Sequence, residues 1–369
     1  MATVYASSHI SINGRFLGRR PTGVDRFAYE VVRELDELVA AKDPQTAGLS
    51  IDVLVPVGVK LAPGTFPQLN VRAVAGAGQR WEQISLPFAA RGTLLLNLCN
   101  AGPLLFRNQV TVLHDAAPIR VPEAYTRAFR TWYAVMAPCI GRVSRRVLTV
   151  SEFSRREIAS AYRIPSAKIG VLPESGEHIL RATETGDVVR KYDLGRRPYV
   201  LAVSSASRHK NFRLVIDAIE LLGASSYDFV IVGANLPIFN ADEQVLPPFV
   251  KHLGYVSDAE LKDLFHHAAC FVFPSLYEGY GLPPVEAMTL GCPVIASNLP
   301  SIREACGDAA LYISPYCASE LASAMDKVMR DATLRKSMRE RGYTQAARHS
   351  WRASALTLLK EISPWLAHR

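Results

Sequence analysis

Several features that would define a function are missing from this chain of 369 residues. No run approaches the roughly 18 uncharged apolar residues of a membrane-spanning helix. Residues 1–11 show no basic region followed by a long apolar core, so we expect no secretory signal. No Asp-x-Asp, His-Glu-x-x-His or Gly-x-Ser-x-Gly motif occurs. The usual ligands of a nucleotide-bound metal ion and the nucleophile elbow of a hydrolase are therefore absent.

Cysteine is also scarce, with six residues and no Cys-x-x-Cys spacing. They are Cys99, Cys139, Cys270, Cys292, Cys306 and Cys317. Most of them lie inside apolar runs, where cysteine behaves as a small hydrophobic residue. The pattern predicts buried thiols in a reducing cytosol and argues against disulfides or a zinc site.

The chain has enough apolar sequence for two cores. Hydrophobic residues make up 49% and charged residues 21%, which excludes a disordered chain. Domains cluster near ~100–200 residues, so the length predicts two. Residues 1–180 hold 21 Lys and Arg against 14 Asp and Glu, whereas residues 181–369 hold 21 against 20. The basic first half indicates either an anionic partner or membrane surface, or a solvated surface without a partner. No RNA-binding motif, zinc finger or basic zipper occurs, so we expect no nucleic acid partner.

Strand-like apolar runs alternate with segments of helical periodicity in both halves of the chain. In the first half we expect strands at 4–10, 51–57, 93–98, 110–114 and 146–151, a last strand that ends in IGVLP (169–173), and helices at 27–39 and 125–146. In the second half we expect strands at 199–205, 229–233, 270–275 and 293–297, and helices at 214–222, 258–268 and 283–291. Strands rich in Val, Ile and Leu between helices indicate a parallel sheet covered on both faces. We therefore predict an α/β protein with two doubly wound, Rossmann-like domains.

A polar, irregular stretch at residues 172–197 separates the two patterns and is the expected seam between the domains. Ligands of such sheets bind beyond the carboxyl ends of the strands. An inter-domain cleft is therefore the expected site.

The strongest local signal is FVFPSLYEGYGLPPVEAMTLGCPVIAS, residues 271–297. A buried strand ends here, a glycine-containing loop follows, and Pro283 and Pro284 lie where a helix can begin. We expect free amides of Gly281, Leu282 and Val285 around that helix start, which is a natural anion site. A diphosphate is the expected guest.

Two glutamates flank this site. We expect Glu286 in the first turn of the helix, where a carboxylate would repel phosphate but could accept the hydroxyl protons of a ribose. Glu278, on the loop, could do the same for the hydroxyls of a sugar. The alternatives are an acid that favours the helix dipole for Glu286 and a solvated loop acid for Glu278. Their position around a glycine loop at a strand end favours the functional interpretation.

Glu278 and Glu286, with seven residues between them, resemble the EX7E signature of the retaining glycosyltransferases of the GT-B fold, family four, also called glycosyl transferases group 1. Other blocks match this family in order: NGRFLGRRPTGVDRFAYEVVREL, VLHDAAPIRVPEAY, RVLTVSEFSRREI, KIGVLPESGEH and SRHKNF. The resemblance covers most of the chain. It implies an acceptor domain at 1–180, a nucleotide-sugar domain at 181–345, and a C-terminal helix at 346–369 that crosses back to the first domain.

The resemblance also implies roles for single residues. Lys210 matches the basic residue that grips the donor diphosphate, which leaves as an anion. Ser204 and Ser205 stand where the family often has an arginine, so Arg208 is the expected substitute. Tyr280, Gly281 and Leu282 complete the expected donor-binding set with Glu278 and Glu286.

In the first domain, His114 matches the histidine that lies near the donor sugar and the reaction centre. The alternative is a strand-end histidine with a purely structural role. Asp115 is a weaker positioning candidate. Gly23 matches the first-loop glycine that lets an amide approach the phosphates or the acceptor, and its alternative is a turn glycine. Glu174 replaces the family's usual asparagine, and we expect it in the cleft near the sugar.

The function implied is retaining, metal-independent transfer of a sugar from a nucleotide-diphosphate sugar to a glycan or lipid-linked glycan in surface polysaccharide assembly. No cofactor besides the donor is implied. GDP-mannose is the first expectation from family frequency, with UDP- or dTDP-sugars as alternatives. The leaving phosphate itself takes the acceptor proton, so no enzyme nucleophile is required. The competing interpretations are a GT-B epimerase or hydrolase of nucleotide-sugars, and a non-catalytic nucleotide-sugar-binding subunit.

An acceptor carried on a lipid diphosphate would be anionic and membrane-bound, which agrees with the basic first half. The expected helix at 125–146 has an apolar stripe flanked by arginines. The stripe holds Tyr125, Phe129, Trp132, Tyr133, Met136, Ile140 and Val143, and the arginines are Arg127, Arg130, Arg142, Arg145 and Arg146. It is either a membrane-surface helix or, as we prefer, an amphipathic helix packed on the sheet. We expect a cytoplasmic protein at the inner face of the plasma membrane.

Overall fold

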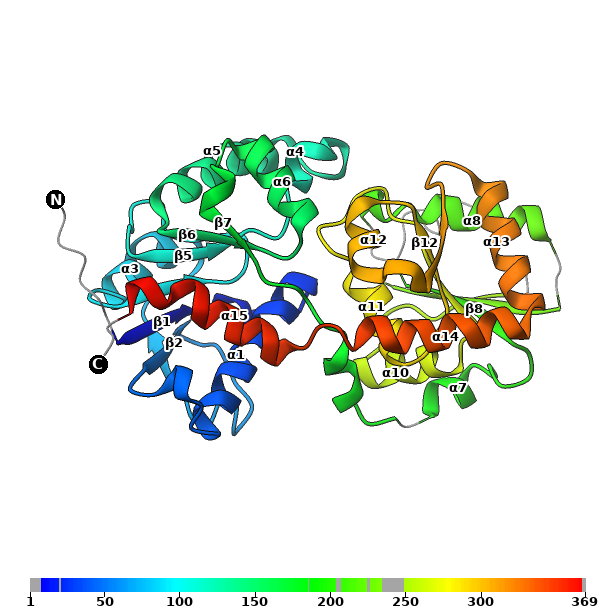
Figure 1. Ribbon diagram of the computed structural model, residues 1–369, viewed down its shortest axis with the longest axis horizontal. Coiled ribbons are helices and arrows are strands. Elements are labelled where there is room, and N and C mark those ends of the chain that lie inside the picture. Colours follow the sequence, from blue (N-terminus) through cyan, green and yellow to red (C-terminus); the bar gives the residue numbers. More distant parts are fainter. Residues whose placement is uncertain are drawn as a thin grey trace. The chain divides into compact units, whose positions relative to one another are not determined.

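The computed structural model describes residues 8–19, 21–184, 186–203, 207–223, 226–233 and 249–366. The chain forms two compact units, and each is described by itself (Figure 1). The first unit comprises Met1–Glu174 and Trp351–Arg369, and the second comprises Ser175–Ser350. The chain thus passes between units after Glu174, inside the polar stretch 172–197.

The first unit is built on a seven-stranded, wholly parallel sheet with the order β3-β2-β1-β4-β5-β6-β7. Its strands are β1 His9–Asn13, β2 Ser50–Pro56, β3 Asn70–Val74, β4 Leu94–Asn97, β5 Gln109–Val112, β6 Arg146–Thr149 and β7 Ile169–Val171. Its helices are α1 Gly23–Ala40, α2 Gly78–Arg80, α3 Leu86–Ala89, α4 Ala117–Arg120, α5 Arg127–Val143, α6 Glu152–Tyr162 and α15 Trp351–Ile362. The strand order reverses between β1 and β4, which marks the switch point of a doubly wound sheet.

The second unit holds a six-stranded parallel sheet with the order β10-β9-β8-β11-β12-β13. Its strands are β8 Tyr199–Val203, β9 Asp228–Val232, β10 Val250–His252, β11 Cys270–Phe273, β12 Val294–Ser297 and β13 Ala310–Ile313. Its helices are α7 Asp187–Lys191, α8 Phe212–Leu222, α10 Asp258–His267, α11 Leu282–Thr289, α12 Pro300–Cys306, α13 Ala318–Arg330 and α14 Ala332–Ala346. Strands β8 and β11 are neighbours, so the loops that follow them meet at one edge of the sheet.

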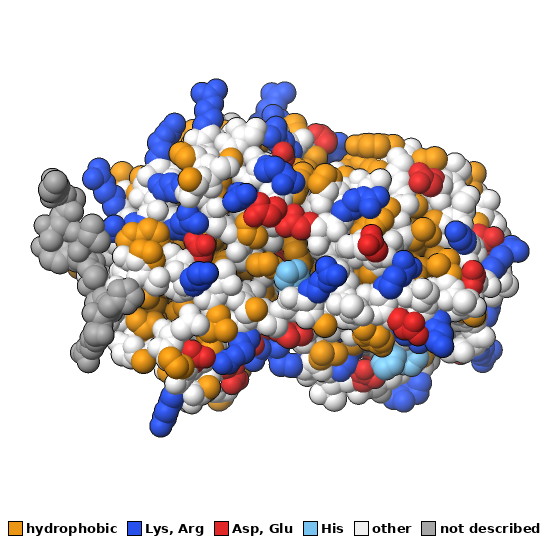
Figure 2. Space-filling model, in the orientation of Figure 1, with side chains coloured by type: hydrophobic (Ala, Val, Ile, Leu, Met, Phe, Trp, Pro, Cys, Tyr) orange, Lys and Arg blue, Asp and Glu red, His pale blue; other side chains and the backbone are white. Residues whose placement is uncertain are grey.

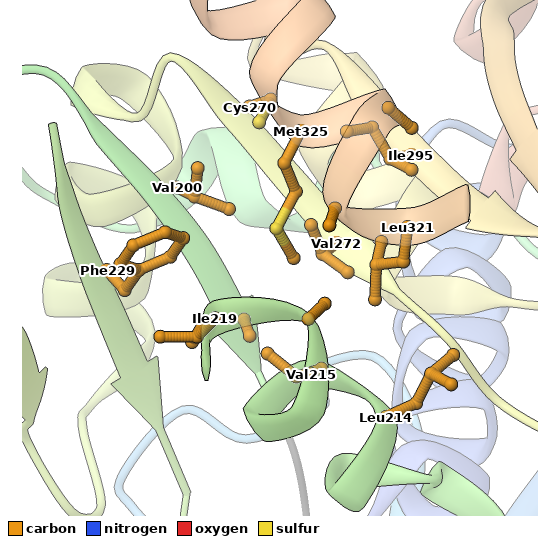
Figure 3. Close-up of a cluster of buried hydrophobic side chains, with 14 of the residues drawn as sticks. Val200, Leu214, Val215, Ile219, Phe229, Cys270, Val272, Ile295, Leu321 and Met325 are labelled. Atoms are coloured by element: carbon orange, nitrogen blue, oxygen red, sulfur yellow. The ribbon is translucent and has the colours of Figure 1, made fainter. Parts of the chain in front are cut away.

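The core of the second unit lies between the sheet and helices α8 and α13 (Figure 3). Val200, Phe229 and Val272 point from β8, β9 and β11 toward the helices, where Val215 and Met325 meet them. All five side chains are at most 2% exposed. Burial of such side chains stabilises a fold by roughly 1.5–3 kcal/mol each, so this layer holds the strand ends in place.

The C-terminal helix α15 packs on α1 in the first unit. The ring of Trp351 lies edge-on to Phe27 of α1 with 5.9 Å between centroids, and both side chains are fully buried. Arg146 at the start of β6 donates a 2.7 Å hydrogen bond to Glu361 of α15. Helix α15 thus completes the core of the unit to which β6 and α1 belong.

The central strands and the helices predicted from the sequence are present, but the long helices α6, α13 and α14 and two edge strands were not predicted. Strands β3 and β13 were not expected, and each lies at the edge of its sheet, where residues are half-exposed and apolar runs are weak. The first strand was expected at residues 4–10 but spans His9–Asn13; residues 4–7 lie outside the described part. No helix of the described residues is both long and apolar enough to span a bilayer.

The cysteines are only partly as expected. Cys270, Cys292 and Cys306 are buried, and burial raises the pKa of the Cys270 and Cys306 thiols to about 12. Cys99, Cys139 and Cys317 are partly exposed, and all six thiols are free.

Candidate functional site

The loop after β11 and the start of α11 have the local geometry that their prolines and glycines predict. Gly281 caps the helix with φ +122°, in a region that side-chain-bearing residues rarely adopt. Leu282 is the first helical residue, and Pro283 and Pro284 follow it, where no amide donor is needed. The amide of Val285 already donates to the Gly281 carbonyl at 3.4 Å. Val285 was expected to offer a free amide, and this expectation is wrong because its amide closes the first turn.

Glu286 is also displaced from its expected place. It is the fifth residue of α11 and therefore lies one residue beyond the first turn, in which no acidic residue occurs. Its side chain is 11% exposed, and its carboxylate accepts a 2.8 Å hydrogen bond from Nε2 of His178. Glu286 is thus a buried carboxylate with a fixed orientation. An acid that only favours the helix dipole would lie in solvent, so the structure disagrees with that alternative.

His178 is a site residue that the sequence reasoning missed. It lies 108 positions before Glu286, is 5% exposed, and its Nδ1 lies 3.3 Å from the Ser175 carbonyl oxygen. Gly176 allows this approach, because a Cβ there would lie 2.7 Å from the backbone of Val285. The available signal was the block KIGVLPESGEH, which ends on this histidine.

The turn that carries Lys210 is tied to the loop after β11. Asn211 adopts a left-handed conformation with φ +55°, and its side chain donates to the carbonyls of Pro274 at 3.0 Å and Pro315 at 2.7 Å. The amide of Leu276 donates to the His209 carbonyl at 2.7 Å. These contacts hold the residues that follow β8 beside those that follow β11.

Lys210 and Glu278 form an ion pair across these two segments. Nζ of Lys210 lies 2.7 Å from Oε1 of Glu278, and the two side chains are 23% and 13% exposed. The neighbouring His209 is half-buried, and desolvation, followed by the charge of Lys210, lowers the pKa of its imidazole. An ammonium group, two amides at a helix start and a buried carboxylate therefore gather at the carboxyl ends of β8 and β11, an arrangement that can bind an anion and hydroxyl groups together.

The other donor-site candidates of the second unit lie around this group. Tyr280 and Leu282 are buried, with 4% and 7% of their surface exposed. Arg208 is exposed at the start of the Lys210 turn. Ser204 and Ser205, the positions where the family often has arginine, lie outside the described residues. Among the residues described, no three His, Cys, Asp or Glu side chains come together as a metal-binding group.

In the first unit, His114 lies two residues beyond β5 and is 4% exposed. Its amide donates to the side chain of Asn100 at 2.6 Å, and its Nε2 lies 2.9 Å from the Leu98 carbonyl oxygen. Its Nδ1 lies 3.7 Å from Oε1 of the buried Glu174, and its ring meets Phe27 edge-on at 4.8 Å. This packing agrees with the structural interpretation of His114, and it also gives the ring one fixed orientation.

Asp115 and Gly23 have local backbone roles. The carboxylate of Asp115 accepts a 2.8 Å hydrogen bond from the Ala117 amide at the start of α4. Gly23 is the first residue of α1, after a capping box formed by Thr22 and Asp25. A Cβ at Gly23 would meet no atom within 4 Å, so packing does not require glycine at this position.

Comparisons with known proteins point in one direction. The family profile described as Glycosyl transferases group 1 matches residues 189–345. The chain is 30% identical over 264 residues to O-antigen chain mannosyltransferase B of Escherichia coli, covering 68% of each protein. It is also 30% identical over 229 residues to O-antigen chain mannosyltransferase RfbU of Salmonella typhimurium, covering 61% of this chain and 62% of that protein.

Solved structures share the fold. HepE of Anabaena, in complex with UDP and glucose, superposes with a TM-score of 0.72 at 17% identity, covering 97% of this chain and 99% of that one. WaaG, a glycosyltransferase involved in lipopolysaccharide biosynthesis, superposes with a TM-score of 0.68 at 15% identity, covering 95% and 98%. The resemblance based on the EX7E block is confirmed. The chain belongs to the group 1 glycosyltransferases, family four, and its two parallel sheets flanked by helices form the GT-B fold.

Proposed function

We propose that this protein is a retaining mannosyltransferase that uses GDP-mannose and extends a lipid-linked glycan in surface polysaccharide assembly. The relatives named O-antigen mannosyltransferases support the sugar and the pathway class. The observation that carries the proposal is the grouping of Lys210, Glu278 and the start of α11 at adjoining strand ends, with Glu286 buried behind them. UDP- and dTDP-sugars are the alternative donors.

Each residue of this group has a proposed part in donor binding. The diphosphate lies at the amides of Gly281 and Leu282, and Lys210 meets its charge. Glu286 accepts the ribose hydroxyls with the oxygen that His178 leaves available. Arg208 and Tyr280 border the nucleotide. Glu278 is already beside Lys210, and it exchanges part of that ion pair for hydroxyls of the mannose when donor binds.

The chemical step needs no enzyme nucleophile in this proposal. The bond between the anomeric carbon and the phosphate oxygen breaks, and the acceptor oxygen bonds to that carbon on the same face. The acceptor proton passes to the leaving phosphate. Lys210 and the helix amides stabilise the negative charge that develops on the diphosphate, and we propose that they do so without a metal ion.

The first unit supplies the proposed acceptor side. We propose that His114, oriented by Glu174, acts near the transferred sugar, and that Asp115 and Gly23 border the acceptor. An acceptor carried on a lipid diphosphate is anionic, and residues 1–180 carry a net positive charge. The protein would then work at the cytoplasmic face of the membrane.

The test is mannosyl transfer from labelled GDP-mannose to a lipid-linked or synthetic glycan acceptor. Removing one preorganised cation from a developing anion costs about 10²–10³ in kcat, so K210A should lose activity on that scale. The matched control is K251A, because Lys251 forms a comparable ion pair with Asp228 at 3.3 Å on an edge strand. Equal activity of K210A and K251A would contradict the assignment. Release of free mannose or an epimer, with no glycosidic product, would contradict the transferase function.

Donor identity is tested separately by thermal unfolding with GDP, UDP and dTDP. A ligand at 100 times its Kd stabilises the native state by about 2.7 kcal/mol, so the preferred nucleotide should raise the melting temperature most. E286A should abolish that shift. A larger shift with UDP than with GDP would show that the donor is a UDP-sugar. The proposed position of the donor site would not be affected.

A further inference from the structure

A buried polar network, which we call the Glu82 network (Asn13, Arg15, Glu82 and Asn97), lies at the switch point of the first sheet. Asn13 is the last residue of β1 and Asn97 the last residue of β4, and the strand order reverses between these two strands. Nδ2 of Asn13 donates 3.1 Å hydrogen bonds to Oδ1 of Asn97 and to Oε1 of Glu82. Nη1 of Arg15 lies 2.5 Å from Oε2 of Glu82. Doubly wound sheets bind their ligands at such a switch point, so the network lies where a substrate of the first unit is expected.

Glu82 reaches this place because the helix that carries it has a wide turn. Residues 78–89 form a continuous helical segment, in which the Leu86 amide donates to the Trp81 carbonyl, five residues back. Such π-turns are rare, and they occur frequently at functional sites. The turn directs two consecutive side chains inward, because Trp81 is fully buried and Glu82 is 2% exposed. A buried carboxylate loses its hydration and needs hydrogen-bonding partners, which the network supplies.

A second arginine borders the same space. Nε of Arg19 donates a 2.6 Å hydrogen bond to the buried Asp25. Arg15, Arg19 and Glu82 line a small enclosed cavity of about 20 Å³, which is room for about one hydroxyl-sized group. The side chains of Arg15 and Arg19 are 31% and 44% exposed, so both also face solvent. A guanidinium group has five N–H donors, and one acid does not use all of them.

The charges at this edge of the sheet do not leave a positive surplus. Arg15 and Arg19 are each neutralised by a buried acid, and two further carboxylates, Asp115 and Glu174, follow β5 and β7. Among the described residues named around this edge, two arginines thus face four carboxylates. A phosphate or carboxylate of a ligand would be repelled here. Sugar hydroxyls fit better, because they donate to carboxylates and accept from guanidinium groups.

Tyr133 of α5 lies between the two groups of charges. Burial, followed by the charge of Asp115, raises the pKa of the Tyr133 phenol to about 12, and Glu82 acts in the same direction. The hydroxyl therefore stays protonated at neutral pH and can donate a hydrogen bond. A half-buried phenol offers both an apolar ring face and a polar tip, a combination that suits a sugar ring.

The positive charge of the first half of the chain lies elsewhere. Residues 1–180 hold more basic than acidic residues. Arg127 and Arg142 of α5 are exposed, and Figure 2 shows long Lys or Arg side chains projecting from the edge of the first unit where Figure 1 places α5. Part of the basic surplus therefore projects into solvent instead of lining the Glu82 network.

We propose that the Glu82 network selects an acceptor that ends in a neutral sugar. Arg15 contacts hydroxyl groups of that sugar, and Glu82 acts through Arg15 as a positioning residue that also cancels its charge. The diphosphate of a lipid-linked acceptor then lies away from this edge, and the far end of the glycan enters. This inference rests on the proposed function and adds the acceptor class to it. A transferase that leaves a neutral sugar at the end of the glycan must act before this protein.

The experiment compares neutral and anionic acceptors that share one ring. The acceptors are octyl glycosides of mannose and glucose, each as the neutral sugar, the 6-phosphate and the uronic acid, with labelled GDP-mannose as donor. The two anionic forms separate a phosphate from a carboxylate. The parent protein should use the neutral form more efficiently, by roughly tenfold or more in kcat/KM, because like charges repel at close range.

Two variants should shift this preference in opposite directions. E82Q leaves the charge of Arg15 uncompensated, so the ratio of neutral to anionic kcat/KM should fall roughly tenfold. R15Q leaves the charge of Glu82 uncompensated, so the ratio should rise, and the KM for the neutral acceptor should increase roughly tenfold. The kcat for the neutral acceptor should change much less, because neither residue touches the reacting atoms. A role in stability alone would not move the ratio in two directions.

The matched control is D52N on β2. Asp52 is also 2% exposed, accepts a 2.9 Å hydrogen bond from the Asn70 side chain, and lies 2.5 Å from Nη1 of Arg72. Like Glu82, it is a buried carboxylate between an amide and a guanidinium group. D52N and E82Q should therefore lower the free energy of unfolding in urea titrations by similar amounts. Only E82Q should change the acceptor ratio.

Three results would overturn the proposal: a parent protein that uses anionic acceptors as well as neutral ones, ratios of E82Q and R15Q that move together, or an equal shift in D52N. If no acceptor receives mannose, the proposed function fails, and the acceptor class is decided without donor. Saturation-transfer NMR with the full chain should then show binding of the neutral octyl glycosides, weaker binding of their 6-phosphates, and a smaller difference in E82Q. Equal or reversed binding by the parent protein would refute the acceptor class alone.

Discussion

The hydrogen bond between His178 and Glu286 offers the sharpest test of the candidate site. The two atoms lie 2.8 Å apart, and the residues are 5% and 8% exposed, so water cannot replace the lost partner freely. A hydrogen bond to a charged group contributes about 1.5–3 kcal/mol. If that energy orients Glu286 for the ribose, H178A should raise the KM for the donor by roughly tenfold to a hundredfold. The effect on kcat should be much smaller, because Glu286 does not touch the reacting atoms.

The control separates orientation from simple stability. His9 lies 3.2 Å from the buried Asp52 in the first unit, away from the donor site, and its side chain is 37% exposed, so H9A removes a more solvated histidine–carboxylate pair. Both H9A and H178A should lower the free energy of unfolding in urea titrations, but only H178A should change the donor KM. H178Q, which restores an amide donor, should recover part of the affinity. The reasoning is refuted if H178A has the parent KM while its unfolding free energy falls as it does in H9A.

Three further predictions concern glycines and pH. G281A should lower the unfolding free energy by about 1–3 kcal/mol, since φ is +122° at this position, and an unchanged melting temperature would refute that strain. G176A should weaken donor binding and unfold at lower temperature, because its Cβ would lie 2.7 Å from the backbone of Val285; G195A, with no atom within 4 Å, is the neutral control. Burial, the largest cause, lowers the pKa of His209 below 6.5 in the folded protein. Below pH 6.5 the unfolded chain therefore binds a proton that the folded chain does not, and the free energy of unfolding should fall as the pH drops. H209Q should flatten that dependence in urea titrations at pH 7.5 and 5.5, and an unchanged slope would count against it.

Much of the fold could be predicted because the signals are local. Central strands such as β8 and β11 are buried on both faces, so they appear as continuous apolar runs. The start of α11 follows from Pro283 and Pro284, whose fixed φ suits the first turn. Edge strands were missed because one side faces solvent, which removes the apolar run that marks a strand.

The site could be predicted only in part. The spacing of Glu278 and Glu286 and the position of Lys210 follow from motifs, and the structure brings Lys210 and Glu278 within 2.7 Å. Glu286 was placed in the first turn of α11 but lies one residue beyond it. The sequence does not show which residue makes the first hydrogen bond within the helix. His178 was overlooked because its role depends on its contact with Glu286. That contact cannot be seen in the sequence, where the two residues are 108 positions apart.

The sequence by itself determined the two-unit α/β organisation, the family and the kinds of residue in the candidate site. These depend on periodicity and short-range spacing, which each segment expresses without knowledge of its neighbours. Tertiary structure decided that His178 meets a carboxylate 108 positions away and that half of α5 remains uncovered. The contact of His178 depends on which segments lie side by side in the folded unit. The exposure of α5 depends on how much of the helix finds a neighbour to pack against. A hydrophobic pattern shows that a side chain can be buried, but only the packed neighbours decide whether anything covers it.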